Sequence, residues 1–246
     1  MYRKQFFRLS VILGILMLAT LVGCDLNGNS TETFSEEEVI EMMAADLASE
    51  GGEMSTLDDI SNSPPATGSF DRTLSWDGTY VKAQRTYDLT ITGDADDYTI
   101  DGTVTGWADR PRIDSSFNSN TALTATDWDG NGTFTVNGTV SRKGTIDYES
   151  LFRDATRDTQ SDVTYTYQDV EFTDTSDPTV IGGIIIAEGS FVHEADRVLG
   201  TRRIEWSGTV VFEFAPEGTV TAHVEDSSAS YTVNLGDVDD DDLVNE

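Results

Sequence analysis

The segment from Asp127 to Gly132, Asp-Trp-Asp-Gly-Asn-Gly, holds the residues whose types and spacing best suit metal binding. Oxygen ligands at alternate positions and a glycine at the sixth position match the first half of an EF-hand type of calcium loop. The twelfth position, where such a loop carries a bidentate glutamate, is Gly138, and the flanking segments have the pattern of strands. Two interpretations remain: a small calcium site formed by Asp127, Asp129 and Asn131, or a turn rich in Asp and Gly.

The other candidates for chemistry give weaker signals. Asp94, Asp96 and Asp97 allow the same two interpretations, a calcium site or a turn. The two histidines, His193 and His223, have neither the His-x-x-x-His spacing of a metal site nor a Gly-x-Ser-x-Gly nucleophile turn elsewhere in the chain. The sequence therefore predicts a protein that is not an enzyme. A carboxylate-based hydrolase stays an alternative, because any two of the 45 acidic residues could meet in the fold.

The N-terminus has the pattern of an export signal. Met1–Arg8 carries three cations, and Leu9–Leu21 is an apolar run broken only by Ser, Gly and Thr. Thirteen residues of helix reach about 20 Å, which is too short for a hydrocarbon core of about 30 Å. A basic head followed by a short apolar segment is typical of a secretory signal that is later removed.

The end of this segment, Leu21-Val22-Gly23-Cys24, resembles the lipobox of bacterial lipoproteins. The resemblance covers about the first 24 residues and implies cleavage before Cys24, a diacylglyceryl thioether on its sulfur and a further acyl chain on its new amino group. Two or more acyl chains hold a protein stably on a membrane. The resemblance thus implies a lipid anchor at Cys24 and a place in the cell envelope, on the outer membrane, with the periplasmic or surface face left open. Cys24 is also the one cysteine in the chain, so an intramolecular disulfide is excluded.

The charge balance is strongly acidic. The chain has 15 Lys and Arg against 45 Asp and Glu, and the signal segment holds three of the cations and none of the acids, so the mature chain carries twelve cations and a formal charge of −33. This charge excludes nucleic acid as a partner, because phosphate binding needs a basic surface. Because a large like charge destabilises a compact state unless salt screens it, the composition also favours a halophilic protein over an ordinary acidic surface protein.

A short helix precedes the main domain. Ser35 and Glu38 form a capping box, acidic residues occupy the first turn, and apolar residues follow at helical spacing. The pattern predicts a helix from about Glu36 to Ser49 that docks on its own domain or on a partner. We expect six parts: signal peptide, lipidated tether, amphipathic helix, linker, β domain and acidic disordered tail, at residues 1–23, 24–34, 35–50, 51–68, 69–236 and 237–246.

Apolar and polar residues alternate from Ser69 to Leu235, which is typical of strands in antiparallel sheets. The pattern predicts an all-β fold, a single antiparallel meander of about ten strands that forms a barrel or a sandwich. Arg85 breaks the alternation of its strand, which suggests a strand end, a bulge or a carboxylate partner. A slip in phase between Tyr167 and Val170 predicts a β-bulge. The expected strands are 70–76, 79–92, 98–107, 121–128, 133–141, 162–172, 180–193, 202–214, 219–225 and 229–235, with longer excursions at 109–120 and 148–161.

The tryptophans bear on binding. Trp206 shares the apolar side of its strand, so we expect it in the core, whereas Trp107 and Trp128 end strands on the polar side. These two form either an exposed aromatic patch for a sugar or a partner, or pack under neighbouring loops. The sequence predicts a non-enzymatic binding or scaffolding module with an envelope protein or glycan as partner. The alternative is a carrier barrel for an apolar ligand, and the oligomeric state stays open.

Overall fold

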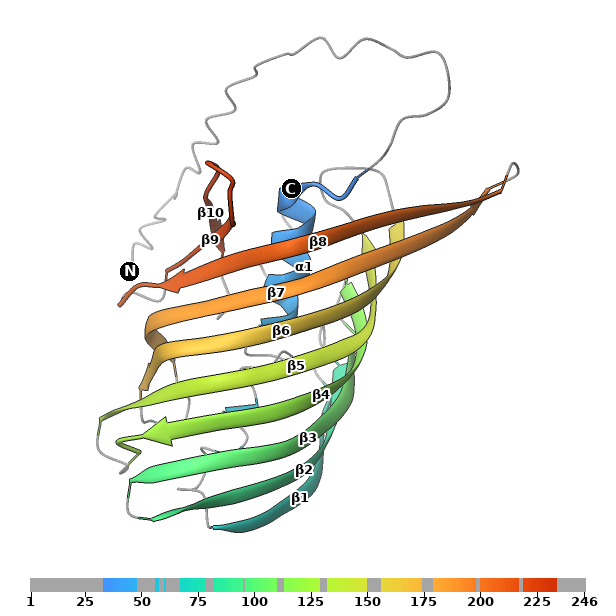
Figure 1. The fold of residues 1–246 in the computed structure, drawn as a ribbon. Coiled ribbons are helices and arrows are strands. Elements are labelled where there is room, and N and C mark those ends of the chain that lie inside the picture. The colour runs from blue at the N-terminus through green and yellow to red at the C-terminus, as the bar shows by residue number, and fades with distance from the viewer. Residues whose placement is uncertain are drawn as a thin grey trace, which may run out of the picture. The chain divides into compact units, whose positions relative to one another are not determined.

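The computed structural model is a sheet of ten antiparallel strands with one helix against it (Figure 1). The helix is α1 (Glu36–Leu47), and the strands follow one another in the sheet in the order of the sequence. The strands are β1 (Gly68–Asp77), β2 (Lys82–Asp94), β3 (Asp97–Asp109), β4 (Ile113–Thr126), β5 (Thr133–Glu149), β6 (Thr156–Thr173), β7 (Val180–Arg197), β8 (Gly200–Phe214), β9 (Val220–Val224) and β10 (Tyr231–Val233). The structure describes residues 33–47, 56–57, 60, 67–77, 82–94, 96–109, 113–128, 132–149, 156–173, 179–197, 200–216 and 219–233.

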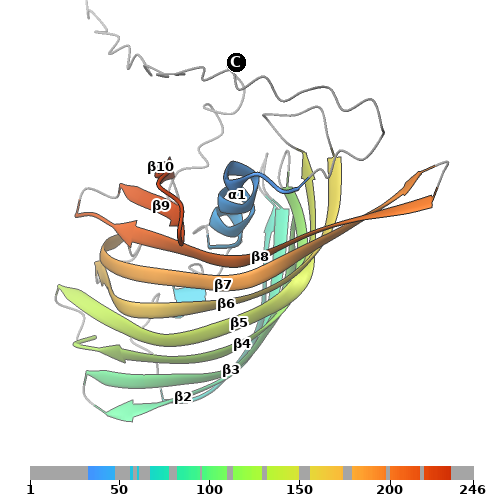
Figure 2. The ribbon, with the colours of Figure 1, turned by 45° about the horizontal axis from the view of Figure 1, so that its top comes forward.

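The predicted all-β meander is confirmed, and its sheet is open. Each strand pairs with its neighbours in the chain, and among the described residues β1 pairs with β2 alone and β10 with β9 alone. The sheet curves around α1 instead of closing on itself (Figures 1 and 2). We call the face that packs against α1 the inner face and the opposite one the outer face. The signal segment, the tether with Cys24 and the acidic tail lie outside the described residues, apart from positions 33 and 34.

Alternating side chains explain why these segments form strands with one dry face. In β2, residues 83, 85, 87, 89 and 91 are buried on the inner face, and the residues between them are exposed. Several strands are longer than the pattern predicted, because β4 begins at Ile113, β5 ends at Glu149, β6 begins at Thr156 and β7 ends at Arg197. More than half of the expected excursion at 148–161 is therefore strand. The expected excursion at 109–120 was wrong. Its inner-face residues include Ser115 and Ser119, whose small hydroxyl side chains hide the apolar period.

The predicted bulge in β6 is confirmed. The pairing of β6 with β7 shifts between Gln168 and Glu171, and Asp169 takes a φ of 49°. The backbone N–H of Asp169 donates to the side-chain oxygen of Asn137 at 2.9 Å, and the Asn137 amide donates to the Asp169 carboxylate at 3.1 Å. These bonds replace ladder contacts that the extra residue removes, and such a bulge increases the local twist of the strand.

Helix α1 begins as its capping box predicts. The Ser35 backbone N–H donates to Glu38 Oε2 at 2.9 Å, and the Glu38 N–H donates to Ser35 Oγ at 3.3 Å. Glu36 and Glu37 of the first turn accept hydrogen bonds from the Tyr231 hydroxyl at 3.4 and 3.2 Å. Burial, followed by the charges of Glu37 and Glu36, raises the pKa of Tyr231 to about 12, so the hydroxyl remains a donor over a wide pH range. The start of the helix is thus tied to β10.

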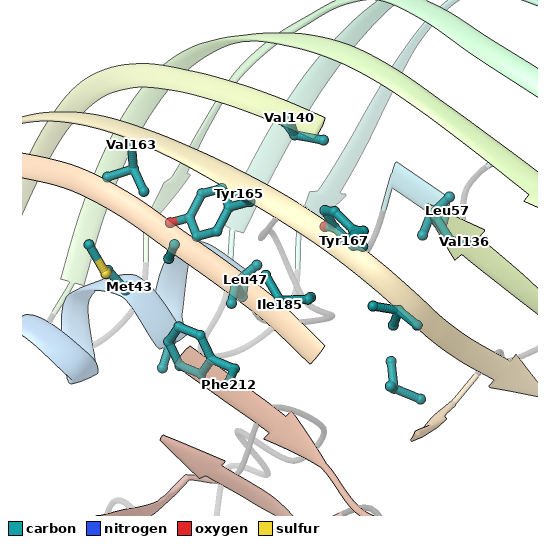
Figure 3. Close-up of a cluster of buried hydrophobic side chains, with 14 of the residues drawn as sticks. Met43, Leu47, Leu57, Val136, Val140, Val163, Tyr165, Tyr167, Ile185 and Phe212 are labelled. Atoms are coloured by element: carbon teal, nitrogen blue, oxygen red, sulfur yellow. The ribbon is translucent and has the colours of Figure 1, made fainter. Parts of the chain in front are cut away.

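The helix fills the inner face of its own domain. Val39, Met42, Met43 and Leu47 are fully buried, and they share one cluster with the inner faces of the strands. Figure 3 shows Met43 and Leu47 of α1 within this cluster, together with Val163, Tyr165, Tyr167, Ile185 and Phe212. No helix among the described residues combines the length and the apolar character needed to cross a bilayer.

The predicted linker also contributes to this core. Within it the structure describes Thr56, Leu57 and Ile60, which have helical backbone and are 1–3% exposed. The segment lacks an apolar period, so its pattern predicts no role in packing. Two apolar residues are nevertheless enough to extend the cover that α1 provides on the inner face.

A buried ion pair joins α1 to the middle of the sheet. Asp46 of α1 lies 2.9 Å from the Arg142 guanidinium, with both side chains no more than 3% exposed, and the Tyr165 hydroxyl donates to Asp46 at 3.3 Å. The Arg142 guanidinium lies 3.7 Å from the centre of the Phe117 ring, and that of Arg85 lies 5.5 Å from it. These cation–π contacts offset part of the cost of burying the charges.

Arg85 is the fourth residue of β2, near the start of the strand, and its break in the alternation has a structural reason. Its guanidinium donates to Thr56 Oγ1 at 3.2 Å, and the side chain is 1% exposed. Gly106 and Gly144 flank Phe117 in the sheet, and a Cβ on Gly144 would lie 2.0 Å from the Ser116 carbonyl oxygen. A Cβ on Gly106 would lie 2.9 Å from the Phe117 ring, so a side chain at either glycine would clash with this part of the sheet.

Removing one partner of the buried pair should destabilise the fold strongly. Asp46→Asn leaves the Arg142 charge buried without its carboxylate, and we expect a loss of about 3–5 kcal/mol in the free energy of unfolding. Urea unfolding followed by circular dichroism measures it. Exposed Asp71→Asn, the matched control, should change stability by less than about 0.5 kcal/mol.

The double variant D46L/R142M replaces the pair with apolar side chains and should recover most of the stability. A loss for Asp46→Asn no larger than that of Asp71→Asn would contradict the claim that this pair holds α1 on the sheet.

Candidate functional site

The predicted calcium loop is only partly within the described residues. Asp127 is exposed and takes a φ of 63°, a left-handed conformation that Asp tolerates in turns. Asp129 and Asn131 lie outside the described residues, and so does the side chain of Asp94. In the part of the chain that the structure describes, no group of three His, Cys, Asp or Glu residues is placed to hold a metal ion.

Trp128, inside the same loop, is a packing residue. It is 2% exposed and stacks on Phe134 with ring centres 4.4 Å apart. Its backbone N–H donates to the carbonyl oxygen of Asp96 at 2.9 Å, which ties the β4–β5 loop to the β2–β3 loop. For Trp128 the structure therefore supports packing over exposure. Trp206 is half-buried and lies 5.8 Å from Phe191, at the border of the core.

The histidines do not form a site with one another. His193 is 8% exposed, and its Nδ1 lies 2.6 Å from the carbonyl oxygen of Asp158. Because a carbonyl oxygen only accepts, Nδ1 carries the proton and the contact is a bridge between β7 and β6. His223 pairs with Val211 in the β8–β9 ladder and is half-buried. Both positions serve the packing of strands.

Four aspartates lie side by side across β3–β6. Asp109 pairs with Asp114, Asp114 with Asp147, and Asp147 with Asp158, all on the outer face. Burial, followed by the charge of Asp158 and a hydrogen bond to it, raises the pKa of Asp147. Part of this rise comes from like charges placed opposite each other on neighbouring strands, an arrangement that destabilises a sheet.

A shallow pocket of about 420 Å³ opens on the outer face of β2–β5, away from α1. Trp107 is the one aromatic side chain that lines the pocket from this face. It is 42% exposed, and no other large hydrophobic side chain among the described residues is exposed. We call this site the Trp107 pocket. The residues that line it are Gln84, Thr86, Thr105, Gly106, Trp107, Ser116, Phe117, Asn118, Lys143 and Gly144.

Cross-strand register builds the pocket from three rows. One row is Gln84, Trp107 and Ser116; another is Thr86, Thr105, Asn118 and Lys143. The row between them consists of Gly106, Phe117 and Gly144, whose side-chain positions face inward, so only their backbone separates the two outer rows. The side chains that point outward from neighbouring strands thus bring an indole, two amides and several hydroxyls together.

The pocket has few charged groups, although the chain as a whole is strongly acidic. Its lining contains no Asp or Glu, and its one charge, Lys143, forms an ion pair of 2.6 Å with Asp162 on the outer face of β6. Ser116 shares a hydrogen bond of 2.8 Å with Thr145, and Gln84 donates to Ser75 at 3.2 Å. The lining thus combines one exposed indole with side chains that donate and accept hydrogen bonds, which are groups that binding sites use.

Sequence reasoning located part of this site. It singled out Trp107 but left its exposure open, and it missed Ser116 and Asn118 because it treated their segment as an excursion. Gln84 and Lys143 are far from Trp107 in the sequence, and only the strand register brings them to it. Between Ser115 and Thr121 only Phe117 is apolar, so the sequence of this segment holds little signal that could have extended β4 and revealed the site.

Comparisons of the chain with protein-family models, with curated proteins and with solved structures find no match. The functional argument therefore depends on the geometry and chemistry of the chain itself.

Removing the charge of Asp147 should stabilise the protein at neutral pH. The raised pKa means that the folded state binds this proton more tightly than the unfolded state, so stability falls as pH rises from the usual carboxyl range through the raised pKa. Asp147→Asn should therefore raise the melting temperature at pH 7, and the gain should vanish below about pH 3, where the Asp147 carboxyl is protonated in both the folded and the unfolded state. Melting curves across pH measure it, with exposed Asp101→Asn as the control, and a neutral-pH loss of stability would contradict the interpretation.

Proposed function

We propose that this protein is a lipid-anchored protein of the cell envelope whose β domain is a non-enzymatic binding module, with the Trp107 pocket as its binding site. The observation that carries the binding role is one exposed tryptophan set in a pocket of amides and hydroxyls on the free outer face. Exposed aromatic residues in concave sites are typical of recognition. The lipobox at Leu21–Cys24 supports the anchor.

Charge supports lipid as the means of attachment. A mature chain with a formal charge of −33 is repelled by anionic headgroups, so electrostatic attraction cannot hold it on a bilayer. Acyl chains on Cys24 would hold it independently of charge. Its partners are then the membrane, through the anchor, and an envelope protein or glycan, through the domain. Nucleic acid is not among them.

The carrier alternative draws less support from the inner face. A carrier for an apolar ligand needs an apolar cavity. Here Met43 and Leu47 of α1, with Leu57 after it, occupy the inner face and pack into the core. An apolar ligand would have to displace the helix and break the pair of Asp46 with Arg142. The hydrolase alternative would require two carboxyls in a cleft, whereas Asp147 and Asp158 lie on the open outer face.

The anchor can be tested by mass spectrometry of the mature protein extracted from bacterial membranes. We expect the chain to begin at Cys24 with the added mass of two or three acyl chains. Cys24→Ser removes the sulfur that takes the diacylglyceryl group and should leave the protein unmodified and absent from the membrane fraction. An unmodified N-terminus at another residue in the wild-type protein would remove the lipoprotein part of the proposal.

A further inference from the structure

The Trp107 pocket has features that limit the chemistry of its ligand, on the premise of the proposed binding function. We propose that it binds a neutral, hydroxyl-rich chain, that is, an uncharged polysaccharide or glycan. Three observations support this: a single exposed aromatic ring, a lining of groups that both donate and accept hydrogen bonds, and the absence of carboxylates from that lining.

The indole of Trp107 offers a flat apolar surface with polar neighbours. Its strand places Gln84 on one side and Ser116 on the other, in the same row of the sheet. A sugar ring has one face formed mainly by C–H groups and a rim of hydroxyls. Such a ring can lie on the indole with its C–H face while its rim meets the side chains beside it, which matches an amphipathic aromatic at a wet surface.

The polar lining matches hydroxyl groups. Amide side chains present one acceptor and two donors, and hydroxyl side chains both donate and accept. Gln84 and Asn118 supply the amides, and Thr86, Thr105 and Ser116 supply the hydroxyls. A ligand hydroxyl can therefore donate to one side chain and accept from its neighbour without leaving a polar group unpaired, which limits the desolvation cost of binding.

The charges favour an uncharged ligand. The lining has no carboxylate to pair with a cation, and its one cation, Lys143, already lies 2.6 Å from the Asp162 carboxylate. The net charge of −30 for the full chain opposes the approach of an anionic polymer. A neutral chain needs no carboxylate partner in the lining and is not repelled by the net charge of the protein.

The dimensions favour a short stretch of chain over one small molecule. The pocket spans β2–β5, which is about 14 Å at the usual strand spacing of about 4.8 Å. A protein partner fits less well, because stable protein interfaces have a core of several large apolar residues. Trp107 is the one exposed large hydrophobic side chain among the described residues.

Affinity electrophoresis tests the proposal with the complete mature lipoprotein, kept in a detergent whose head group is not a sugar. Native gels would contain a mixed-linkage β-glucan, glycogen or galactomannan as neutral chains, or polygalacturonate as an anionic one. We expect at least one neutral polysaccharide to slow the wild-type protein and polygalacturonate to leave it unaffected. Trp107→Ala should weaken the retardation about tenfold, as expected for a central aromatic contact.

Three further variants separate recognition from folding. Trp107→Phe keeps an aromatic surface and should retain part of the binding, and Asn118→Ala should weaken it. Thr90→Ala, on the outer face of β2 but outside the pocket, should behave as wild type. All variants should keep the wild-type melting temperature, because the side chains that they change are exposed.

The proposal fails if no neutral polysaccharide slows the wild-type protein, if Trp107→Ala is slowed as strongly as wild type, or if polygalacturonate binds more tightly than the neutral chains. A failure here with acylated Cys24 intact would leave the membrane anchor standing. If Trp107→Ala instead abolished a cross-link to an envelope protein while no polysaccharide bound, the pocket would be a protein-binding site and the glycan assignment would be wrong.

Discussion

The apolar inner face of a single open sheet has to be covered, and this constraint governs the rest of the structure. A barrel would cover that face with its own far wall; here α1, a helix of twelve residues, packs against it, and Leu57 and Ile60 belong to the same buried cluster. The buried pair of Asp46 and Arg142 fixes the helix, because both side chains are no more than 3% exposed and the loss of either partner would remove a charge that balances the other in the core. A buried charge without its partner destabilises the fold strongly, so the position of α1 that forms this pair is favoured over other positions. This selection holds even where the pair itself adds little net stability.

The two faces of the sheet consequently have different roles. The inner face packs on α1, whereas the outer face stays open to solvent over β2–β5 and carries the polar side chains of every second residue. On that face an exposed tryptophan gains nothing for packing, so recognition is the better account of Trp107. The threonine, serine and asparagine side chains around it present hydroxyl and amide groups at the pocket. The acidic charge of the chain opposes the approach of anionic molecules.

The sequence contained most of the fold but little of the site. Alternation revealed the strands because each has one dry face, and the capping box of Ser35 and Glu38 revealed the start of α1. Alternation failed in β4, where Ser115 and Ser119 occupy inner positions, and it could not show that α1, not a second sheet, covers the inner face. Trp107 and Trp128 looked alike, because both end strands on the polar side. What separates them is loop packing: Trp128 stacks on Phe134 across a hairpin, and Trp107 has no such loop over it among the described residues.

Hydroxyl-radical footprinting of the protein, read residue by residue by mass spectrometry, tests the division into a covered inner face and an exposed outer face most directly. The account predicts fast oxidation of Trp107 and protection of Met42, Met43 and Trp128, which are at most 2% exposed. Methionine is intrinsically reactive, so its protection would report that α1 lies against the sheet. Oxidation of Met42 and Met43 at the rate of the unfolded chain, or protection of Trp107 in the absence of ligand, would contradict the account.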